Sequence, residues 1–139
     1  MAEGVLRYKT TGLDLEIDSA GTSNYHEGDG PDARAVKTMR KKGIDISKLR
    51  ARQFEVADFD RFDQIYAMDS SNYQNILKLA RNQADVDKVS LFVNELYPGS
   101  DGEVPDPYFG GPDGFEEVYK LLDETTDKII EKLNDGSEQ

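Results

Sequence analysis

Residues 64–72 read Gln-Ile-Tyr-Ala-Met-Asp-Ser-Ser-Asn, a short apolar run followed directly by polar side chains. An apolar run of this length is typical of a strand that is buried in a parallel sheet. The polar residues that begin at Asp69 offer several caps for a helix. That helix would carry the apolar side chains Tyr73, Ile76, Leu77 and Ala80. The stretch therefore predicts a strand followed by a helix in an α/β sheet.

Two further segments have the pattern of strands. Residues 13–17 alternate leucine or isoleucine with acidic side chains, which is typical of a half-buried strand. Residues 89–93 form a second short apolar run. Together with residues 64–68, they predict three strands.

Helical signals lie between and around these strands. Residues 1–9 predict a helix that begins without an N-cap residue. Pro31 is expected at the first helical position of a second helix, which ends at Gly43 as its C′ residue. Residues 56–62 predict a short helical turn. Residues 115–133 predict the longest helix, because their apolar side chains fall on one stripe.

Strands that alternate with helices in this order predict a doubly wound parallel sheet in three layers, with helices on both faces. We expect a single domain over residues 1–139, with a frayed polar tail at 134–139. The first predicted helix has no strand before it, whereas a doubly wound sheet usually begins with a central strand. We therefore expect that first strand to be absent from this sequence.

The composition excludes several classes of function. The net charge of −11 argues against nucleic acid and anionic lipid as partners, because both require a basic surface. The sequence contains no cysteine, so thiol catalysis, disulfides and thiolate metal sites within it are excluded. No apolar run approaches the ~20 residues of a membrane span, and the absence of a targeting segment predicts a cytoplasmic protein.

Three polar clusters follow predicted strands or lie in the long loop between 98 and 114. They are Asp18-Ser19, residues 69–72 and the loop around Asp106. Ligands of open α/β sheets bind beyond the carboxyl ends of the strands, although each cluster could also simply end a strand or cap a helix. Asp106 lies between two prolines and beside Tyr108 and Phe109. This setting suits either a general acid for an aromatic substrate or a rigid turn with surface aromatic rings.

Several motifs resemble one family over almost the whole chain. Asp106-Pro107-Tyr108-Phe109-Gly110 is similar to the acid loop of the low-molecular-weight protein tyrosine phosphatases. Asp18-Ser19-Ala20-Gly21-Thr22 and Met68-Asp69-Ser70-Ser71-Asn72 are similar to two further segments of that family. Met1-Ala2-Glu3-Gly4-Val5 resembles the segment that follows the family's phosphate loop.

The resemblance implies hydrolysis of phosphotyrosine in proteins through a phosphocysteine intermediate, without a cofactor or a metal. It implies that Asp106 is the general acid and base, and that Tyr25, Tyr108 and Phe109 flank the phosphotyrosine ring. The same resemblance implies that Ser19 supports the phosphate loop, while Asp69 and Asn72 lie at the edge of the site. The family's nucleophile lies in a Cys-x5-Arg loop. That loop and the first strand are missing from this sequence, so the chain as given is predicted to be inactive.

Four interpretations follow. The first is a phosphatase with an incomplete sequence, and the second is a catalytically dead binding module that keeps the aromatic walls. The third, arsenate reduction on the same fold, requires a relay of cysteines that the sequence lacks. The fourth, a metal-dependent receiver domain, requires paired acids at the end of a first strand, and the acids here lie in other contexts. The oligomeric state and the physiological substrate do not follow from the sequence.

Overall fold

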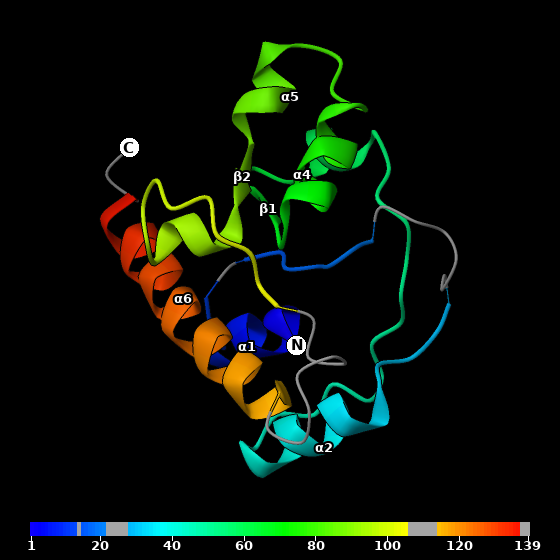
Figure 1. Cartoon of the computed structure of the whole chain (residues 1–139), viewed down its shortest axis with the longest axis vertical. Coiled ribbons are helices and arrows are strands. Elements are labelled where there is room, and N and C mark those ends of the chain that lie inside the picture. Colours follow the sequence, from blue (N-terminus) through cyan, green and yellow to red (C-terminus); the bar gives the residue numbers. More distant parts are fainter. Residues whose placement is uncertain (14, 22–27, 106–113, 137–139) are drawn as a thin grey trace. The chain divides into compact units, whose positions relative to one another are not determined.

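The computed structural model describes residues 1–13, 15–21, 28–105 and 114–136 (Figure 1). Contacts divide the chain into two compact units. The first unit comprises Met1–Asp18, Gly30–Arg50 and Pro105–Gln139, and the second comprises Ser19–Asp29 and Ala51–Val104. The elements follow in the order α1 (Ala2–Lys9), α2 (Ala33–Lys41), α3 (Asp58–Arg61), β1 (Ile65–Ala67), α4 (Ser70–Leu77), α5 (Gln83–Asp87), β2 (Val89–Leu91), the 3-10 helix η1 (Phe92–Glu95) and α6 (Gly114–Gly136).

The second unit is built on the two parallel strands β1 and β2, with Ile65 opposite Val89 and Ala67 opposite Leu91. These four side chains are all buried. The connection between the strands runs through α4 and α5, as a parallel pair requires. Figure 1 shows both strands and the two helices in green. The parallel pairing and both strand positions confirm the sequence prediction, although β2 ends at Leu91 because the chain turns into η1.

A compact apolar core supports this sheet. Phe54 and Phe59 meet edge to face, with ring centroids 5.2 Å apart. Helix α4 contributes Ile76, and Leu77 packs against the same core from the last turn of the helix. The predicted helix was longer, since it included Ala80. Ala80 lies beyond the end of α4 and still packs against this core. An apolar residue is therefore favoured at this position by its contact with the core and not by a place in the helix.

The first unit is organised by α6, which contacts both α1 and α2. One face of α6 is buried, and it includes Phe115, Val118, Leu122 and Ile129 of the predicted apolar stripe, together with Thr125 and Thr126. Lys9 at the end of α1 reaches α6, where its Nζ lies 2.6 Å from Asp123 Oδ1 and 2.7 Å from Asp127 Oδ1. None of the helices in the described part of the chain is long and apolar enough to cross a membrane.

The ends of α2 show how local chemistry sets a helix. Asp32 is the N-cap, and its Oδ1 accepts a hydrogen bond of 2.8 Å from the Arg34 amide. Pro31 therefore precedes the cap, and its predicted place at the first helical position is wrong. The predicted C′ glycine is confirmed. Gly43 has a φ of +80°, and the Gly43 and Ile44 amides donate to the carbonyls of Arg40 and Met39 at 2.9 and 3.0 Å, which is a Schellman ending.

The strand predicted over residues 13–17 does not form. Leu13 is 51% exposed and Leu15 is 40% exposed, and within the described residues the sheet contains only β1 and β2. The Leu13 amide instead donates to the Thr10 carbonyl at 2.9 Å, which continues the turn that ends α1. An alternating pattern produces a strand only where a neighbouring strand supplies hydrogen bonds, and no strand among the described residues pairs with this segment.

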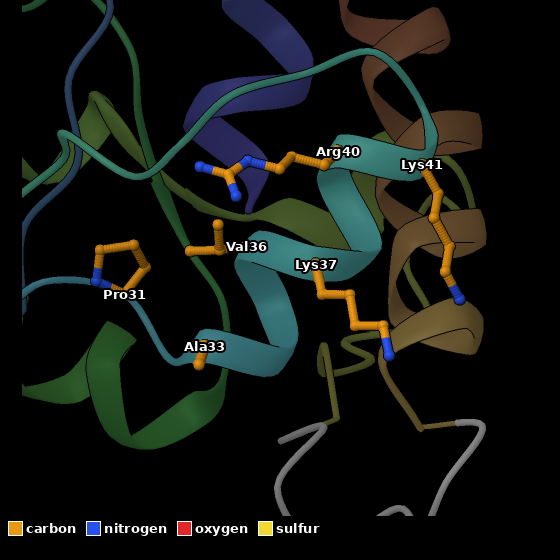
Figure 2. A pocket seen from close by; sticks show the side chains of 6 residues that line it. All are labelled: Pro31, Ala33, Val36, Lys37, Arg40 and Lys41. Carbon is orange, nitrogen blue, oxygen red and sulfur yellow. The ribbon is translucent and has the colours of Figure 1, made fainter.

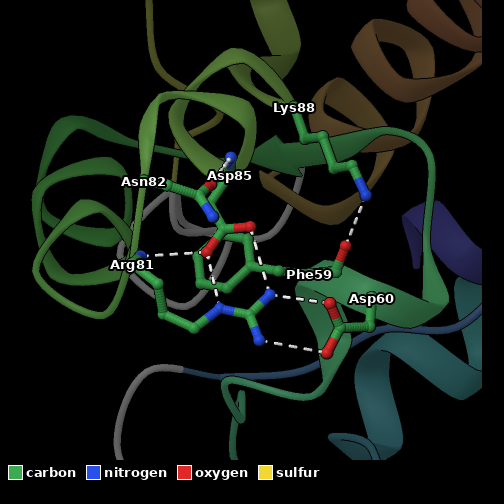
Figure 3. Close-up of polar contacts among 6 residues, drawn as sticks. All are labelled: Phe59, Asp60, Arg81, Asn82, Asp85 and Lys88. Atoms are coloured by element: carbon green, nitrogen blue, oxygen red, sulfur yellow. Dashed lines mark hydrogen bonds and ion pairs between the residues drawn. The ribbon is translucent and has the colours of Figure 1, made fainter.

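Arg81 joins α3 to α5 in the second unit (Figure 3). Its Nη2 lies 2.7 Å from Asp60 Oδ1, and its Nε lies 2.9 Å from Asp85 Oδ2. Asp85 is 3% exposed, and its carboxylate also accepts a hydrogen bond from the Arg81 amide at 2.9 Å. Hydrogen bonds from Arg81 lower the pKa of both carboxyl groups. The sequence did not predict α5, because the short helix has no apolar stripe.

We expect Arg81→Met to destabilise the chain near neutral pH and to matter less in acid. A carboxyl group whose folded pKa is depressed contributes stability above its unfolded pKa of about 3.9, and this stability is lost as the pH falls through the lower folded value. The difference in urea midpoint between the wild type and Arg81→Met should therefore shrink between about pH 6 and about pH 3. Lys78→Met, which removes the same charge from an exposed site, is the control. A constant difference at all pH values would contradict the electrostatic role.

Candidate functional site

The carboxyl end of β1 leads directly into the cap of α4. The strand ends at Ala67, and Asp69 is the N-cap of the helix, with an extended backbone at φ −146° and ψ 174°. Its Oδ1 accepts a hydrogen bond of 2.7 Å from the Asn72 amide. The predicted capping at this position is confirmed. Caps of this kind contribute about 0.5–2 kcal/mol to helix stability.

A second carboxylate lies at the same turn. Glu103 Oε2 accepts a hydrogen bond of 2.8 Å from the Ser70 amide, and the Val104 amide donates to the Met68 carbonyl at 2.8 Å. Hydrogen bonds from the amide and hydroxyl of Ser70 lower the pKa of Glu103. A negative charge is favourable here, because the first turn of a helix presents unpaired amides and the positive end of the helix dipole.

Glu103 and Val104 precede Pro105 and Asp106 in the chain. Their two hydrogen bonds hold the chain at the carboxyl end of β1 as far as Val104, two residues before the predicted acid loop. Sequence reasoning missed this role of Glu103. The signal was weak, since a glutamate 33 positions after Ser70 carries no local mark of a helix cap.

The segment that leads into Glu103 is itself held in place. Asp101 has a φ of +53°, in the left-handed region that few residues other than glycine adopt. Asn94, from η1, stabilises this conformation. Its Oδ1 accepts from the Asp101 amide at 2.8 Å, and its Nδ2 donates to Asp101 Oδ1 at 3.1 Å. The chain from η1 to Val104 is therefore fastened at both ends within the second unit.

Ser19 enters the second unit two residues before an isolated bridge between Gly21 and Gln53. The Gly21 amide donates to the Arg52 carbonyl at 2.8 Å, and the Phe54 amide donates to the Gly21 carbonyl at 2.7 Å. Arg52 is in turn fixed by a bidentate pair with the buried Asp58, at 3.0 and 3.1 Å. Ser19 is exposed. Its predicted support of a phosphate loop stays a prediction.

The structure thus brings Asp69, Ser70, Asn72 and Glu103 together at one turn. Asp106, Tyr25, Tyr108 and Phe109 lie outside the described residues, so their predicted roles stay predictions. Asp18, which the sequence grouped with Ser19, is exposed at the end of a segment of the first unit. The described residues contain no group of three or more histidine or acidic side chains arranged to hold a metal ion.

Comparison with known proteins decides the family. The family model for low molecular weight phosphotyrosine protein phosphatase matches residues 1–139. The chain belongs to this family. The low molecular weight phosphotyrosine protein phosphatase of Schizosaccharomyces pombe is 39% identical over 138 residues, which cover 96% of this chain and 87% of the relative. The Homo sapiens protein of the same name is 34% identical over 139 residues, which again cover 96% and 87%.

Solved structures agree with this assignment. A crystal structure of a protein tyrosine phosphatase from Entamoeba histolytica, with Hepes in the active site, matches this chain with a TM-score of 0.88. The two are 34% identical, and the match covers 98% of this chain and 88% of the other. The predicted fold class, a doubly wound α/β fold of the phosphotyrosine phosphatase type, is confirmed.

The sequence lacks the nucleophile that the chemistry implied by its family resemblance requires. The 139 residues contain no cysteine, and therefore no Cys-x5-Arg loop. The part of the family fold that these residues do supply includes the capped β1–α4 turn and the anchored segment before Asp106.

Proposed function

We propose that this chain provides the acid loop and the substrate-facing side of a phosphatase that hydrolyses phosphotyrosine in proteins, together with small aryl phosphates. The observation that carries the proposal is the family match over residues 1–139. The hydrogen bonds that hold Glu103 and Val104 at the β1–α4 turn support it, because these residues come shortly before Asp106 in the chain.

In the proposed reaction, Asp106 protonates the phenolate oxygen as it leaves phosphorus. Its carboxylate then removes a proton from the water that hydrolyses the phosphoenzyme. Tyr25, Tyr108 and Phe109 form apolar walls for the phenyl ring of the substrate. Ser19 supports the phosphate loop, and Asp69 and Asn72 lie at the edge of the site.

The nucleophile in this scheme is a thiolate in a Cys-x5-Arg loop, which these 139 residues do not contain. Backbone amides and the arginine of such a loop hold the phosphoryl oxygens. The complete site therefore requires a loop of that kind from outside the present sequence.

A chimaera tests the proposal. A family first strand and Cys-x5-Arg loop are placed ahead of Met1, and hydrolysis of a phosphotyrosine peptide is measured by phosphate release. We expect turnover in the chimaera and none after the cysteine of the loop is changed to serine. A well-folded chimaera that binds vanadate but hydrolyses no aryl phosphate would contradict the proposal.

The absence of cysteine favours a second candidate, a binding module without hydrolysis. This candidate predicts that the 139-residue chain binds a fluorescent phosphotyrosine peptide more tightly than its unphosphorylated form. Fluorescence anisotropy measures this difference directly, and equal affinity for both peptides would exclude the binding module.

A further inference from the structure

The charge of the chain is distributed unevenly. Although the net charge is −11, residues 33–50 contain seven basic side chains and only one acidic side chain, Asp45. The rest of the sequence contains the other ten basic and 27 acidic side chains. Helix α2 lies within this basic stretch and buries Ala35, Thr38 and Met39, which leaves its cations on the exposed side.

Two of these cations form ion pairs and contact aromatic rings within the first unit. Arg34 forms an ion pair with Asp32 at 3.0 Å, and its guanidinium lies 5.0 Å from the ring centre of Phe115. Lys42 Nζ lies 3.1 Å from Glu116 Oε2 and 5.1 Å from the ring centre of Tyr119. These residues hold α2 against α6.

Three others face a groove on the first unit (Figure 2). Lys37, Arg40 and Lys41 line an open groove of about 660 Å³, together with Pro31, Ala33 and Val36. Figure 2 shows Lys37 and Lys41 extending from one side of α2, while Arg40 extends on the side of Val36 and Pro31. Within the described residues, none of these three side chains forms an ion pair, unlike Arg34 and Lys42.

We propose that this α2 groove binds a short acidic segment of a partner protein. Three cations with no carboxylate within salt-bridge distance are complementary to aspartate and glutamate side chains. Pro31, Ala33 and Val36 provide an apolar wall on the side of Arg40, which suits one apolar side chain of the segment. The site consists of α2 and Pro31 just before it, so it does not depend on phosphate hydrolysis.

The negative charge of the rest of the chain favours binding of a short acidic segment over binding of an extended polyanion. Charges separated by more than the Debye length of about 8 Å at physiological ionic strength are largely screened. A short peptide in the groove therefore interacts mainly with the local cations. Duplex DNA or an anionic membrane extends over a much wider area, and the net charge of −11 opposes its binding.

Binding of a labelled peptide to the full 139-residue chain tests this site. The probe is a short fluorescein-labelled peptide of glutamates around a single leucine, and a glutamine version is its control. We expect the glutamate peptide to bind, and added salt to weaken the binding. The double variant Lys37→Glu/Lys41→Glu should bind about tenfold more weakly or worse, because two attractive charges become repulsive.

The matched control is Lys78→Glu/Lys120→Glu, which changes the net charge equally at exposed positions outside the groove. We expect its affinity to stay within about threefold of the wild type. Lys37→Gln/Lys41→Gln provides the same test without new repulsion if the first variant does not fold. Equal losses in the two glutamate variants, equal binding of the glutamine peptide, or tighter binding of duplex DNA or phosphatidylserine vesicles would each overturn the proposal.

Discussion

The 139-residue chain should hydrolyse p-nitrophenyl phosphate no faster than buffer. The sequence contains no cysteine, so no thiolate can attack phosphorus and no phosphocysteine can form. It also lacks the loop whose amides would stabilise the equatorial oxygens. In hydrolases whose nucleophile acts with a set of partners, removal of that nucleophile lowers kcat on the order of 10⁶-fold. A continuous assay of p-nitrophenol release measures the result.

The control is the chimaera that carries a Cys-x5-Arg loop, assayed at the same concentration. Its activity would show that the assay and the fold are adequate. Hydrolysis by the 139-residue chain that is lost on mutation of one of its own residues would contradict the prediction, because that residue would then be the nucleophile. Trace activity that no mutation changes would indicate a contaminant.

Local signals in the sequence predicted the elements that depend on local chemistry. Gly43 was recognised as the residue after α2, and it does have a positive φ and the Schellman hydrogen bonds. Asp69 was recognised as one of several possible caps, and its carboxylate does accept from the Asn72 amide. In both cases, the residues that decide the geometry lie within five positions of each other.

Predictions that depended on distant partners were less successful. The alternation in residues 13–17 has the period of a strand, but a strand also requires a neighbour, which a period cannot supply. Ala80 fits the helical spacing of α4 and yet lies beyond its end, because burial alone favours an apolar residue there.

In the candidate site, too, local features could be predicted from the sequence and contacts between distant residues could not. Its capping residue followed from local sequence, whereas Glu103 became visible only when the fold placed it at the Ser70 amide. The assignment of Asp106 as the acid came from the family resemblance, since the residues alone favoured a rigid turn with surface aromatic rings at least as well. The net charge of −11 likewise described the whole chain correctly and gave no indication of the basic groove on α2.

In the chimaera that carries the loop, Asp106→Asn should slow cleavage of phosphotyrosine by about 10²–10⁴-fold, the usual contribution of a general acid. The loss should depend on the leaving group. A basic phenolate requires a proton as it departs, whereas p-nitrophenolate is stable enough to leave with less assistance. A series of aryl phosphates with different phenol pKa values measures this dependence, and the slope should be steeper in the variant.

Asp101→Asn is the matched control for Asp106→Asn. It makes the same chemical change five positions earlier, and asparagine also tolerates the positive φ at that site. The control should keep the leaving-group dependence of the parent.

The pH profile provides an independent measurement, because an acid must be protonated to act. The parent should lose activity as the pH rises through the pKa of that acid, and Asp106→Asn should lose this limb of the profile. If Asp106→Asn kept both the limb and the parent's rate on phosphotyrosine, the proton would have to come from another residue.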